Sequence, residues 1–519
     1  MNELYYGDCL TIMQEMRLGS VDLIYLDPPW NSNRAYNAIY RDSTGLELPD
    51  QVEAFCDIWE LTPERESVIR NMPVLMAQAG IEDSAGKLWQ LWMSALRNTQ
   101  PKLLAYLLYM TERLIVMKGI IKSTGSIYLH CDPTASHYIK SLMDAIFGHK
   151  NFRNEIIWRR TPFSGSSKAR AMQLPRNHDV ILYYTKAGSW VWSGPTTPYT
   201  DKYLTRFKWD DHDGRGPYRK TLLKTFSEAT FKRLKADNRL IDPIRPGAKW
   251  SYKQYLSESS GTRQLDDVWV DINSINPVAS ERLGYPTQKP VALLKRIIQS
   301  STNEGEIVFD PFCGCATTIC AAHELNRKWI GIDIAYHAIK RVAQVRLHDD
   351  YGLVEGVHYT VTGVPRTLEG AQNLWRQDKY GFQRWAIEQV NGFVTTKRTA
   401  DGGIDGRIWF ALPGEKKLRS MVIEVKGGQN VGINALRGAL ERDEADMAGL
   451  ITMEPLPDRQ RQNFGKEMMN AGMLDVMGVQ YPRMQILSVP EILDKRMFLT
   501  PSVAGRGTGQ GNLPLQDTR

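Results

Sequence analysis

A run of six β-forming residues that stops at two prolines is the feature that most constrains this chain. Val21–Leu26 is long enough for one buried strand. Pro28 and Pro29 end it, because proline fixes φ and donates no main-chain hydrogen bond. The Asp27 carboxylate and the Pro28 carbonyl are therefore two acceptors at the carboxyl end of the strand, and Trp30 adds a flat aromatic face. Such a set can clamp a planar base that carries an exocyclic amino group and has left its helix.

A second stretch has the pattern of a nucleotide-binding turn. Gly305–Asp310 predicts a strand, a tight turn follows through Gly314, and Thr318–Leu325 predicts a helix. The next predicted strand ends at Asp333, 19 residues after Gly314. In nucleotide-binding folds the glycine lets the backbone approach the ligand, and the distal acid accepts hydrogen bonds from ribose hydroxyls. Asp310, just before the turn, can pair with an ammonium group.

Asp27-Pro28-Pro29-Trp30 matches the (Asp/Asn/Ser)-Pro-Pro-(Tyr/Phe/Trp) signature of the amino methyltransferases that act on DNA bases, and about residues 1–350 resemble that family. The order of elements resembles its β arrangement: the catalytic motif, a recognition region, the stretch Pro286-Thr287-Gln288-Lys289-Pro290, and then the glycine turn. The resemblance implies S-adenosylmethionine as the cofactor. It also implies a Rossmann-like α/β fold with a mostly parallel sheet and one antiparallel strand.

The resemblance assigns roles to particular residues. Asp27, Pro28, Pro29 and Trp30 would be catalytic. Cofactor binding would fall to Asp8, Thr287, Lys289, Asp310, Phe312, Gly314, Thr317 and Asp333. In the family, the acid at the position of Asp8 contacts the adenine of the cofactor, whereas a Gly-Asp pair by itself is more often a turn or a helix cap. Thr287 and Lys289 would meet the cofactor carboxylate.

Two positions bear on how well this site works. Ala316 stands where the family usually has a second glycine, so the turn loses freedom at positive φ, and cofactor binding is expected to survive this change. Asp27 and the Pro28 carbonyl would accept hydrogen bonds from the target amine and stabilise the positive charge that develops on its nitrogen. Family members with Asp first mostly modify adenine N6, which we expect here. Cytosine N4 is the alternative target.

Basic and aromatic side chains alternate between residues 151 and 280, as in Lys249-Trp250 and Tyr252-Lys253. Such a mixture suits contacts to phosphates and bases, so we expect a target-recognition region at 159–280. One strand near 178–185 is predicted to return to the sheet. A solvated irregular surface is the alternative interpretation. The net charge of +7 permits a polyanionic partner without identifying one.

Two polar groups resemble metal sites, and we expect a metal at neither. Asp210–Gly214 resembles the start of a calcium loop but lacks the later ligands. His130, Cys131 and Asp132 close a predicted strand, where consecutive side chains point in different directions. Their place at a strand end favours a position lining the base or cofactor cleft.

The C-terminal part carries a different pattern. Asp405 lies in a glycine-rich stretch, and Glu424 and Lys426 alternate on a predicted strand, so they share one face. This resembles the PD-(D/E)XK nucleases, and the glycine context resembles the Mrr-type group. The resemblance implies that Asp405 and Glu424 hold Mg²⁺ and, with Lys426, orient a water molecule. Gln383 stands where the family usually has an acid, so an active nuclease and an inert DNA-binding remnant both remain open.

At 519 residues the chain is too long for one ordinary core, and about three units are expected. The predicted parts are a catalytic half at 1–158 with a helical insert at 41–100, the recognition region at 159–280, a cofactor-binding half at 281–352, a smaller nuclease-like α/β domain at 366–498 and a disordered tail at 501–519.

The remaining features favour a cytoplasmic protein, and the resemblance implies double-stranded DNA as its partner. Six cysteines without paired Cys-x-x-Cys knuckles indicate reduced thiols. Glu3 and Asp8 argue against a signal peptide, and the charges within Leu103–Ile121 argue against a membrane span. A restriction subunit and a second copy of the chain are the candidate protein partners. The rival functions are a bifunctional restriction-modification enzyme, a methyltransferase for RNA or protein, and a non-catalytic DNA-binding module.

Overall fold

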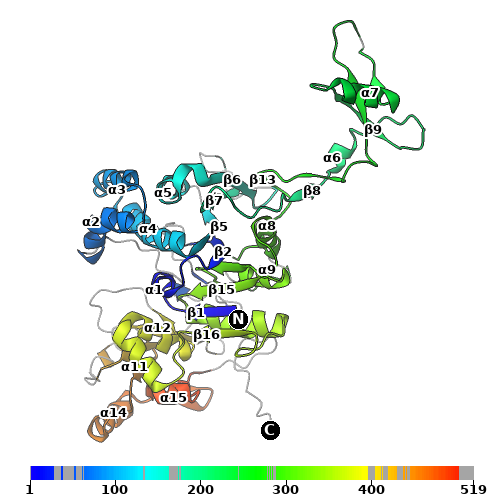
Figure 1. The fold of residues 1–519 in the computed structure, drawn as a ribbon. Coiled ribbons are helices and arrows are strands. Elements are labelled where there is room, and N and C mark those ends of the chain that lie inside the picture. The colour runs from blue at the N-terminus through cyan, green and yellow to red at the C-terminus, as the bar shows by residue number, and fades with distance from the viewer. Residues whose placement is uncertain are drawn as a thin grey trace. The chain divides into compact units, whose positions relative to one another are not determined.

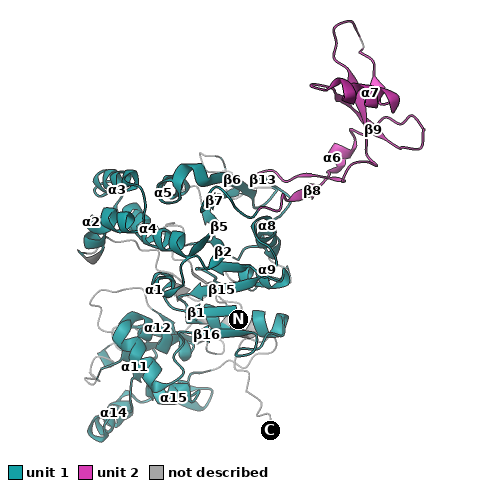
Figure 2. Ribbon diagram, in the orientation of Figure 1, with its two compact units in different colours: residues 1–191, 268–519 teal, residues 192–267 magenta. Residues whose placement is uncertain are grey.

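The computed structural model describes residues 2–28, 37–38, 52–53, 61, 63–131, 135–162, 174, 177–243, 245–276, 279, 281, 283, 288–394, 404–410, 412, 419–428, 437–438, 440 and 445–501. The chain forms two compact units, residues 1–191 with 268–519 and residues 192–267 (Figure 2). The smaller unit falls inside the stretch 159–280 that the sequence predicts for target recognition.

The larger unit contains a nine-stranded sheet in the order β13-β6-β7-β5-β2-β14-β15-β1-β16 (Figure 1). Its strands are β1 (Asn2–Tyr6), β2 (Val21–Leu26), β5 (Ile121–Cys131), β6 (Phe152–Arg159), β7 (His178–Thr185), β13 (Val268–Trp269), β14 (Ile307–Asp310), β15 (Lys328–Asp333) and β16 (Tyr359–Thr362). Neighbouring strands are parallel except where β7 pairs with β5 and β6. The predicted fold class is therefore confirmed.

Helices cover both faces of this sheet (Figure 1). One face packs against α1 (Cys9–Glu15), α2 (Pro63–Gln78), α3 (Asp83–Leu96), α4 (Pro101–Ile120) and α5 (Ser136–Met143). The other face meets α8 (Val291–Ser301) and α9 (Thr317–Glu324), where the Tyr128 hydroxyl lies 2.7 Å from Ser301 Oγ. Because strand side chains alternate, Ile24 and Leu26 enter the first core, whereas Tyr25, which pairs with Tyr128, faces α8.

Strand β2 has the predicted bounds, and all six of its residues are buried. Strands covered on both faces are apolar throughout, which explains the continuous hydrophobic run in the sequence. Asp22 is the charged exception within it. Both of its carboxylate oxygens lie 2.8 Å from Lys122 Nζ, and one also accepts a hydrogen bond from the Ile307 amide at 2.9 Å. The buried carboxylate thus ties β2 to both neighbouring strands.

Helix α4 is the long apolar helix expected near residues 103–121. It buries most of its length in the core, including Arg113, which is 3% exposed. Among the described helices, none combines the length and the apolar character needed to cross a membrane.

The C-terminal part has its own five-stranded sheet in the order β17-β18-β19-β20-β23. Its strands are β17 (Phe393–Val394), β18 (Gly406–Phe410), β19 (Arg419–Lys426), β20 (Met447–Thr452) and β23 (Met484–Ser488). β17, β18 and β19 pair antiparallel, and β19, β20 and β23 pair parallel. The accompanying helices are α11 (Leu368–Gln377), α12 (Lys379–Gln389), α14 (Asp458–Ala471) and α15 (Val489–Leu493).

The smaller unit, residues 192–267, is a compact arrangement of short strands and helices. It contains the sheet β10 (Leu240–Ile241), β11 (Ser251–Tyr255) and β9 (Tyr218–Leu222), the pair β8 (Thr196–Pro198) and β12 (Thr262–Gln264), α6 (Asp201–Leu204) and α7 (Glu228–Ala236). Its cations lie over its own rings: Lys220 Nζ is 3.8 Å from the Trp209 ring centroid, and the Arg215 guanidinium is 4.7 Å from that of Tyr255. The alternation of basic and aromatic residues thus produces a set of cation–π pairs.

Candidate active site

Four neighbouring parallel strands end in acids at one edge of the main sheet. Asp310 and Asp333 are the last residues of β14 and β15, Asp27 directly follows β2, and Asp8 follows β1 by two residues. These strands are neighbours in the order β2-β14-β15-β1. Since parallel strands end at the same edge, Asp27 of the predicted base clamp and the predicted cofactor turn lie there together, although they are far apart in the sequence.

Because β2 pairs directly with β14, the described residues of the predicted base clamp and those of the predicted cofactor turn lie side by side. Leu23 pairs with Val308 and Ile24 with Phe309, so Asp310, the next residue along β14, is level with Tyr25, two residues before Asp27. Burial raises the pKa of Asp310 to about 7, and the nearby Asp27 carboxylate adds to that shift. Phe312 N donates to Asp310 Oδ1 at 3.0 Å, which fixes the start of the turn.

Asp333 closes the glycine turn onto the next strand. Its Oδ2 accepts a hydrogen bond from Gly314 N at 2.8 Å, and its Oδ1 accepts one from Ala335 N at 2.8 Å. Burial raises its pKa to about 6, and these two amides oppose the shift. Each carboxylate oxygen retains a second lone pair, so the acid can still accept a hydrogen bond from a ligand hydroxyl.

Ala316 adopts the left-handed conformation that glycine would adopt without strain. Its φ is +62°, close to the +48° of Gly314 two residues earlier, and it is completely buried. An L-residue in this region costs about 1–2 kcal/mol. Helix α9 begins directly afterwards, with Cys320 N donating to Ala316 O at 2.9 Å. The turn therefore keeps the geometry of a glycine-rich loop, at the expense of local strain.

Asp8 takes the role of a helix cap. Its Oδ1 accepts from Leu10 N at 2.6 Å at the start of α1, and both oxygens accept from Arg113 Nη2 at 3.0 and 2.8 Å. Arg113 in turn lies 3.4 Å over the Tyr109 ring. A Gly-Asp pair is more often a turn or a helix cap than a ligand site, and within the chain Asp8 is a helix cap. Its side chain is 41% exposed, and its contact with a cofactor stays a prediction.

The remaining described cofactor residues lie around the same turn. Phe312 packs against the core, with its ring centroid 6.4 Å from that of Tyr109. Thr317 is buried at the start of α9, where its hydroxyl lies 3.6 Å from Cys315 Sγ. Pro28 is buried beside Asp27. The predicted site residues Pro29, Trp30 and Thr287 lie outside the described residues.

Lys289 contacts the predicted catalytic acid. It immediately precedes Pro290, the N-cap of α8, and its ammonium forms an ion pair with Asp27 Oδ2. Lys289 is 8% exposed. The other oxygen, Asp27 Oδ1, is buried, and no donor among the described residues reaches it. Sequence reasoning assigned Lys289 to the cofactor carboxylate, which stays a prediction, and it missed the pairing with Asp27.

A row of buried polar side chains lies next to this pair. The Tyr25 hydroxyl is 2.9 Å from His130 Nδ1, and His130 Nε2 is 3.3 Å from Asp179 Oδ2. Burial alone would raise the pKa of Asp179, but His130 and the nearby cations Lys289 and Arg160 hold it below its usual value. The sequence singled out His130 as lining the cleft but gave no signal for Tyr25 or Asp179.

A separate polar cluster forms in the C-terminal sheet. Asp405 Oδ2 accepts from Val425 N at 2.7 Å, and Asp405 Oδ1 accepts from Gln383 Nε2 at 3.1 Å. Lys426 Nζ lies 2.5 Å from Glu424 Oε1, and Glu424 is 2% exposed. Burial raises the pKa of Asp405 to about 6 and also raises that of Glu424. The structure therefore brings the three predicted residues together. Within the described ranges, no three His, Cys, Asp or Glu side chains are grouped as metal ligands.

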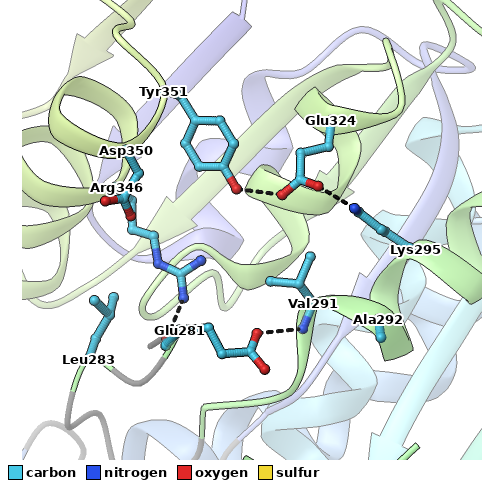
Figure 3. A pocket seen from close by; sticks show the side chains of 9 residues that line it. All are labelled: Glu281, Leu283, Val291, Ala292, Lys295, Glu324, Arg346, Asp350 and Tyr351. Atoms are coloured by element: carbon cyan, nitrogen blue, oxygen red, sulfur yellow. Dashed lines mark hydrogen bonds and ion pairs between the residues drawn. The ribbon is translucent and has the colours of Figure 1, made fainter. Parts of the chain in front are cut away.

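One cavity of about 450 Å³ lies beside α8 and α9 (Figure 3). It is lined by Glu281, Leu283, Val291, Ala292, Lys295, Glu324, Arg346, Asp350 and Tyr351. Tyr351 and Lys295 both point to Glu324, which accepts from the Tyr351 hydroxyl at 2.6 Å and pairs with Lys295 (Figure 3). Of the predicted catalytic and cofactor residues that the structure describes, none lines this cavity.

A comparison with known protein families shows which family the chain with these four acids belongs to. The N6/N4 methyltransferase family model, described as DNA methylase, matches residues 21–344. The chain belongs to this family. The matched span begins at β2 and contains Asp27, Lys289, the glycine turn and Asp333.

Three relatives show the extent of the similarity. The type II methyltransferase M.EcaI of Enterobacter cloacae is 30% identical over 265 residues, 46% of this chain and 56% of that protein. The Mod subunit of the type III restriction-modification enzyme StyLTI of Salmonella typhimurium is 25% identical over 362 residues, 62% of this chain and 50% of that protein. The DNA adenine methyltransferase YhdJ of Escherichia coli is 49% identical over 74 residues, 14% and 25% of the two chains. The chain spans about half the length of the first two relatives.

The strained turn generates a stability prediction. Ala316→Gly should stabilise the protein by about 0.5–1 kcal/mol, because relief of the left-handed strain exceeds the extra entropy of glycine in the unfolded chain. Ala322→Gly is the matched control: Ala322 is buried inside α9, where glycine should destabilise by about 1 kcal/mol. Urea unfolding of both variants measures the difference. Equal destabilisation by the two substitutions would show that Ala316 is not strained.

Proposed function

We propose that this protein transfers a methyl group from S-adenosylmethionine to the exocyclic amino group of a flipped base in double-stranded DNA. The observation that carries the proposal is the adjacency of Asp27 and Asp310 at the ends of the paired strands β2 and β14. One acid belongs to the base clamp and the other to the cofactor turn. Methyl transfer needs the amine and the methyl donor side by side, and the shared edge of these strands would place them so.

The residues present fit the proposed cofactor. Asp310 would pair with the ammonium of its methionine part, and Asp333 would accept from its ribose hydroxyls, beside a turn whose Gly314 allows close approach. Thr317 and Phe312 border the same turn, and we assign Asp8, Thr287 and Lys289 to the adenine and the carboxylate from the family resemblance. When bound, S-adenosylmethionine supplies a methyl group activated by a sulfonium, whose sulfur keeps the bonding pair when the methyl leaves.

The chain's own residues would act on the amine. Asp27 and the Pro28 carbonyl would accept its two N–H groups, so that its lone pair points at the methyl carbon and forms the new N–C bond. The methylated nitrogen then carries a positive charge that Asp27 would stabilise, and it releases one proton to solvent water to restore a neutral amine. Trp30 would stack on the base after it leaves the helix, with Pro29 keeping the corner rigid.

Adenine N6 is the proposed target atom. Asp27 is the first residue of the Asp-Pro-Pro-Trp motif, as in family members that modify adenine, and one relative is named a DNA adenine methyltransferase. Cytosine N4 presents the same amino chemistry and is the second candidate. We assign contacts with duplex DNA to residues 192–267, where Trp209 is 42% exposed and basic side chains surround the aromatic rings.

A restriction subunit is the proposed protein partner. One relative is the Mod subunit of a type III restriction-modification enzyme, a name that describes one component of a larger assembly. A homodimer is the alternative assembly. The place of action would be the cytoplasm, where the DNA and the cofactor are both available.

The proposal is tested by transfer of tritiated methyl from S-adenosylmethionine to duplex DNA, with RNA and protein as competing substrates. Asp27→Ala should lower transfer at least about 100-fold and leave cofactor affinity unchanged, because it removes an acceptor used in the transition state. Asp333→Ala should weaken cofactor binding. Asp83→Ala, an exposed residue paired with Lys87, is the control and should behave as wild type. Wild-type transfer to RNA or protein but not to DNA would contradict the proposal.

Cofactor binding should depend on pH through Asp310. Burial raises its pKa to about 7, and a cationic ligand prefers the ionised acid, so binding should release a proton near neutrality. Below pH 7 the affinity should therefore fall by up to about tenfold per pH unit, and above pH 8 it should level off. Calorimetry in buffers of different ionisation enthalpy measures both effects. Asp310→Asn should bind more weakly with no such dependence; wild-type affinity that is flat from pH 6 to 8 would rule out this role.

We propose, as a second function, a Mg²⁺-dependent nuclease site in the C-terminal sheet. The observation that favours it is that Asp405, Glu424 and Lys426 come together, and burial raises the pKa of both acids although Lys426 opposes the shift. Asp405 and Glu424 would hold the ion, and Lys426 would orient water. Gln383 donates an amide hydrogen to Asp405 where the family usually has an acid, so the site would hold the ion with fewer charges.

Cleavage of unmethylated plasmid DNA with and without Mg²⁺ tests this second function. Wild type should cleave only with the ion, Asp405→Ala should lose cleavage and keep methyl transfer, and Asp27→Ala should keep cleavage. A wild-type protein that methylates DNA but never cleaves it would identify the domain as an inert DNA-binding remnant.

A further inference from the structure

The two oxygens of the Asp27 carboxylate have different surroundings. Oδ2 is paired with the Lys289 ammonium, whereas Oδ1 is buried and receives no hydrogen bond from any described residue. A buried acceptor without a donor costs about 1–3 kcal/mol, so such an atom in a native site calls for an explanation. The N–H of a bound target amine is the donor that would relieve this cost.

Lys289 is paired with Asp27 and is also near enough to a second acid to influence it. Its charge also acts on Asp179, where it helps to hold the pKa down. Asp179 is hydrogen-bonded to His130, and His130 is hydrogen-bonded to Tyr25. Tyr25 is on β2, two residues before Asp27. The side chains of Tyr25, His130 and Asp179 therefore form a row across the neighbouring strands β2, β5 and β7, whose order can be followed in Figure 1.

The donor and the acceptor of each hydrogen bond in this row can be assigned. Because Asp179 is an acceptor, His130 presents Nε2–H to it, and its Nδ1 accepts from the Tyr25 hydroxyl. Tyr25, His130 and Asp179 are each at most 2% exposed. Buried networks whose members are satisfied are rigid, so the row holds β2, β5 and β7 in a fixed arrangement beside Asp27.

We propose that Lys289 is a positioning residue for the methyl transfer. Its ion pair with Asp27 Oδ2 fixes the orientation of the carboxylate, so that Oδ1 faces the target amine. This inference rests on the proposed function and deepens it by naming the oxygen that receives the amine. Without the lysine the carboxylate can rotate between orientations, and part of the in-line alignment is lost. The role differs from the one implied by the resemblance, in which Lys289 serves the carboxylate of the cofactor.

The test compares Lys289→Met and Lys289→Arg with wild type, once wild-type transfer and its DNA sequence have been established. For each protein, single-turnover rates with saturating cofactor give the transfer rate, calorimetry gives the cofactor affinity, and a thermal melt checks folding. Lys295→Met is the matched control, since Lys295 lies on α8 and pairs with Glu324 away from Asp27. Lys289→Gln replaces the methionine variant if that variant does not fold.

Lys289→Met should slow transfer by about 10–100-fold with the cofactor affinity within about threefold of wild type. Lys289→Arg should recover most of the rate, because it keeps a cation at Oδ2. In an Asp27→Asn background, Lys289→Met should change the rate by less than about threefold, since the two residues act as one unit. Lys295→Met should match wild type throughout.

Two results would overturn the inference. One is a tenfold or greater loss of cofactor affinity in Lys289→Met with an unchanged rate at saturation, which would assign Lys289 to the cofactor. The other is an equal rate loss from Lys289→Met with and without Asp27→Asn, which would show that the lysine acts independently of Asp27. Neither result resembles failure of the proposed function, in which wild type transfers no methyl group at all.

Discussion

The parallel pairing of β2 with β14 is the constraint on which the site depends. The two strands lie far apart in the sequence, and the intervening chain forms the helices, the antiparallel return of β7 and the separate unit 192–267. Once they pair, the acid that follows one and the acid that ends the other must lie at the same edge, because parallel strands end together. The buried Asp22 reinforces this pairing by accepting the Ile307 amide at the entrance to β14.

Much of this arrangement could be predicted from the sequence, because its signals are local. The apolar run of β2 and its diproline stop define a buried strand, and the strand, turn, helix and acid from Ile307 to Asp333 define the cofactor half. Each element depends on short-range patterns of burial and turn geometry. The antiparallel strand β7 was likewise visible as a hydrophobic run. Ala316 shows the limit of such signals, since it keeps the left-handed turn that its sequence disfavours.

Contacts between distant side chains could not be predicted in the same way. The ion pair of Lys289 with Asp27 and the row from Asp179 through His130 to Tyr25 depend on which side chains the strand register sets opposite each other. Lys289 was recognised only through its motif, which pointed to the cofactor. Asp8 shows the same ambiguity. Its side chain caps α1 and pairs with Arg113, whereas the family resemblance assigns it to the adenine of the cofactor. Local sequence does not decide between such uses of a carboxylate.

The central claim is that the base clamp and the cofactor turn form one methyl-transfer site for DNA. It is tested most directly by sequencing that detects modified bases in DNA from cells expressing the protein, with cells expressing Asp27→Ala as the reference. The account predicts methyl groups on the exocyclic amine of adenine, confined to one sequence context and absent with the variant. DNA from the two cultures that carries identical modifications, or none, would contradict it.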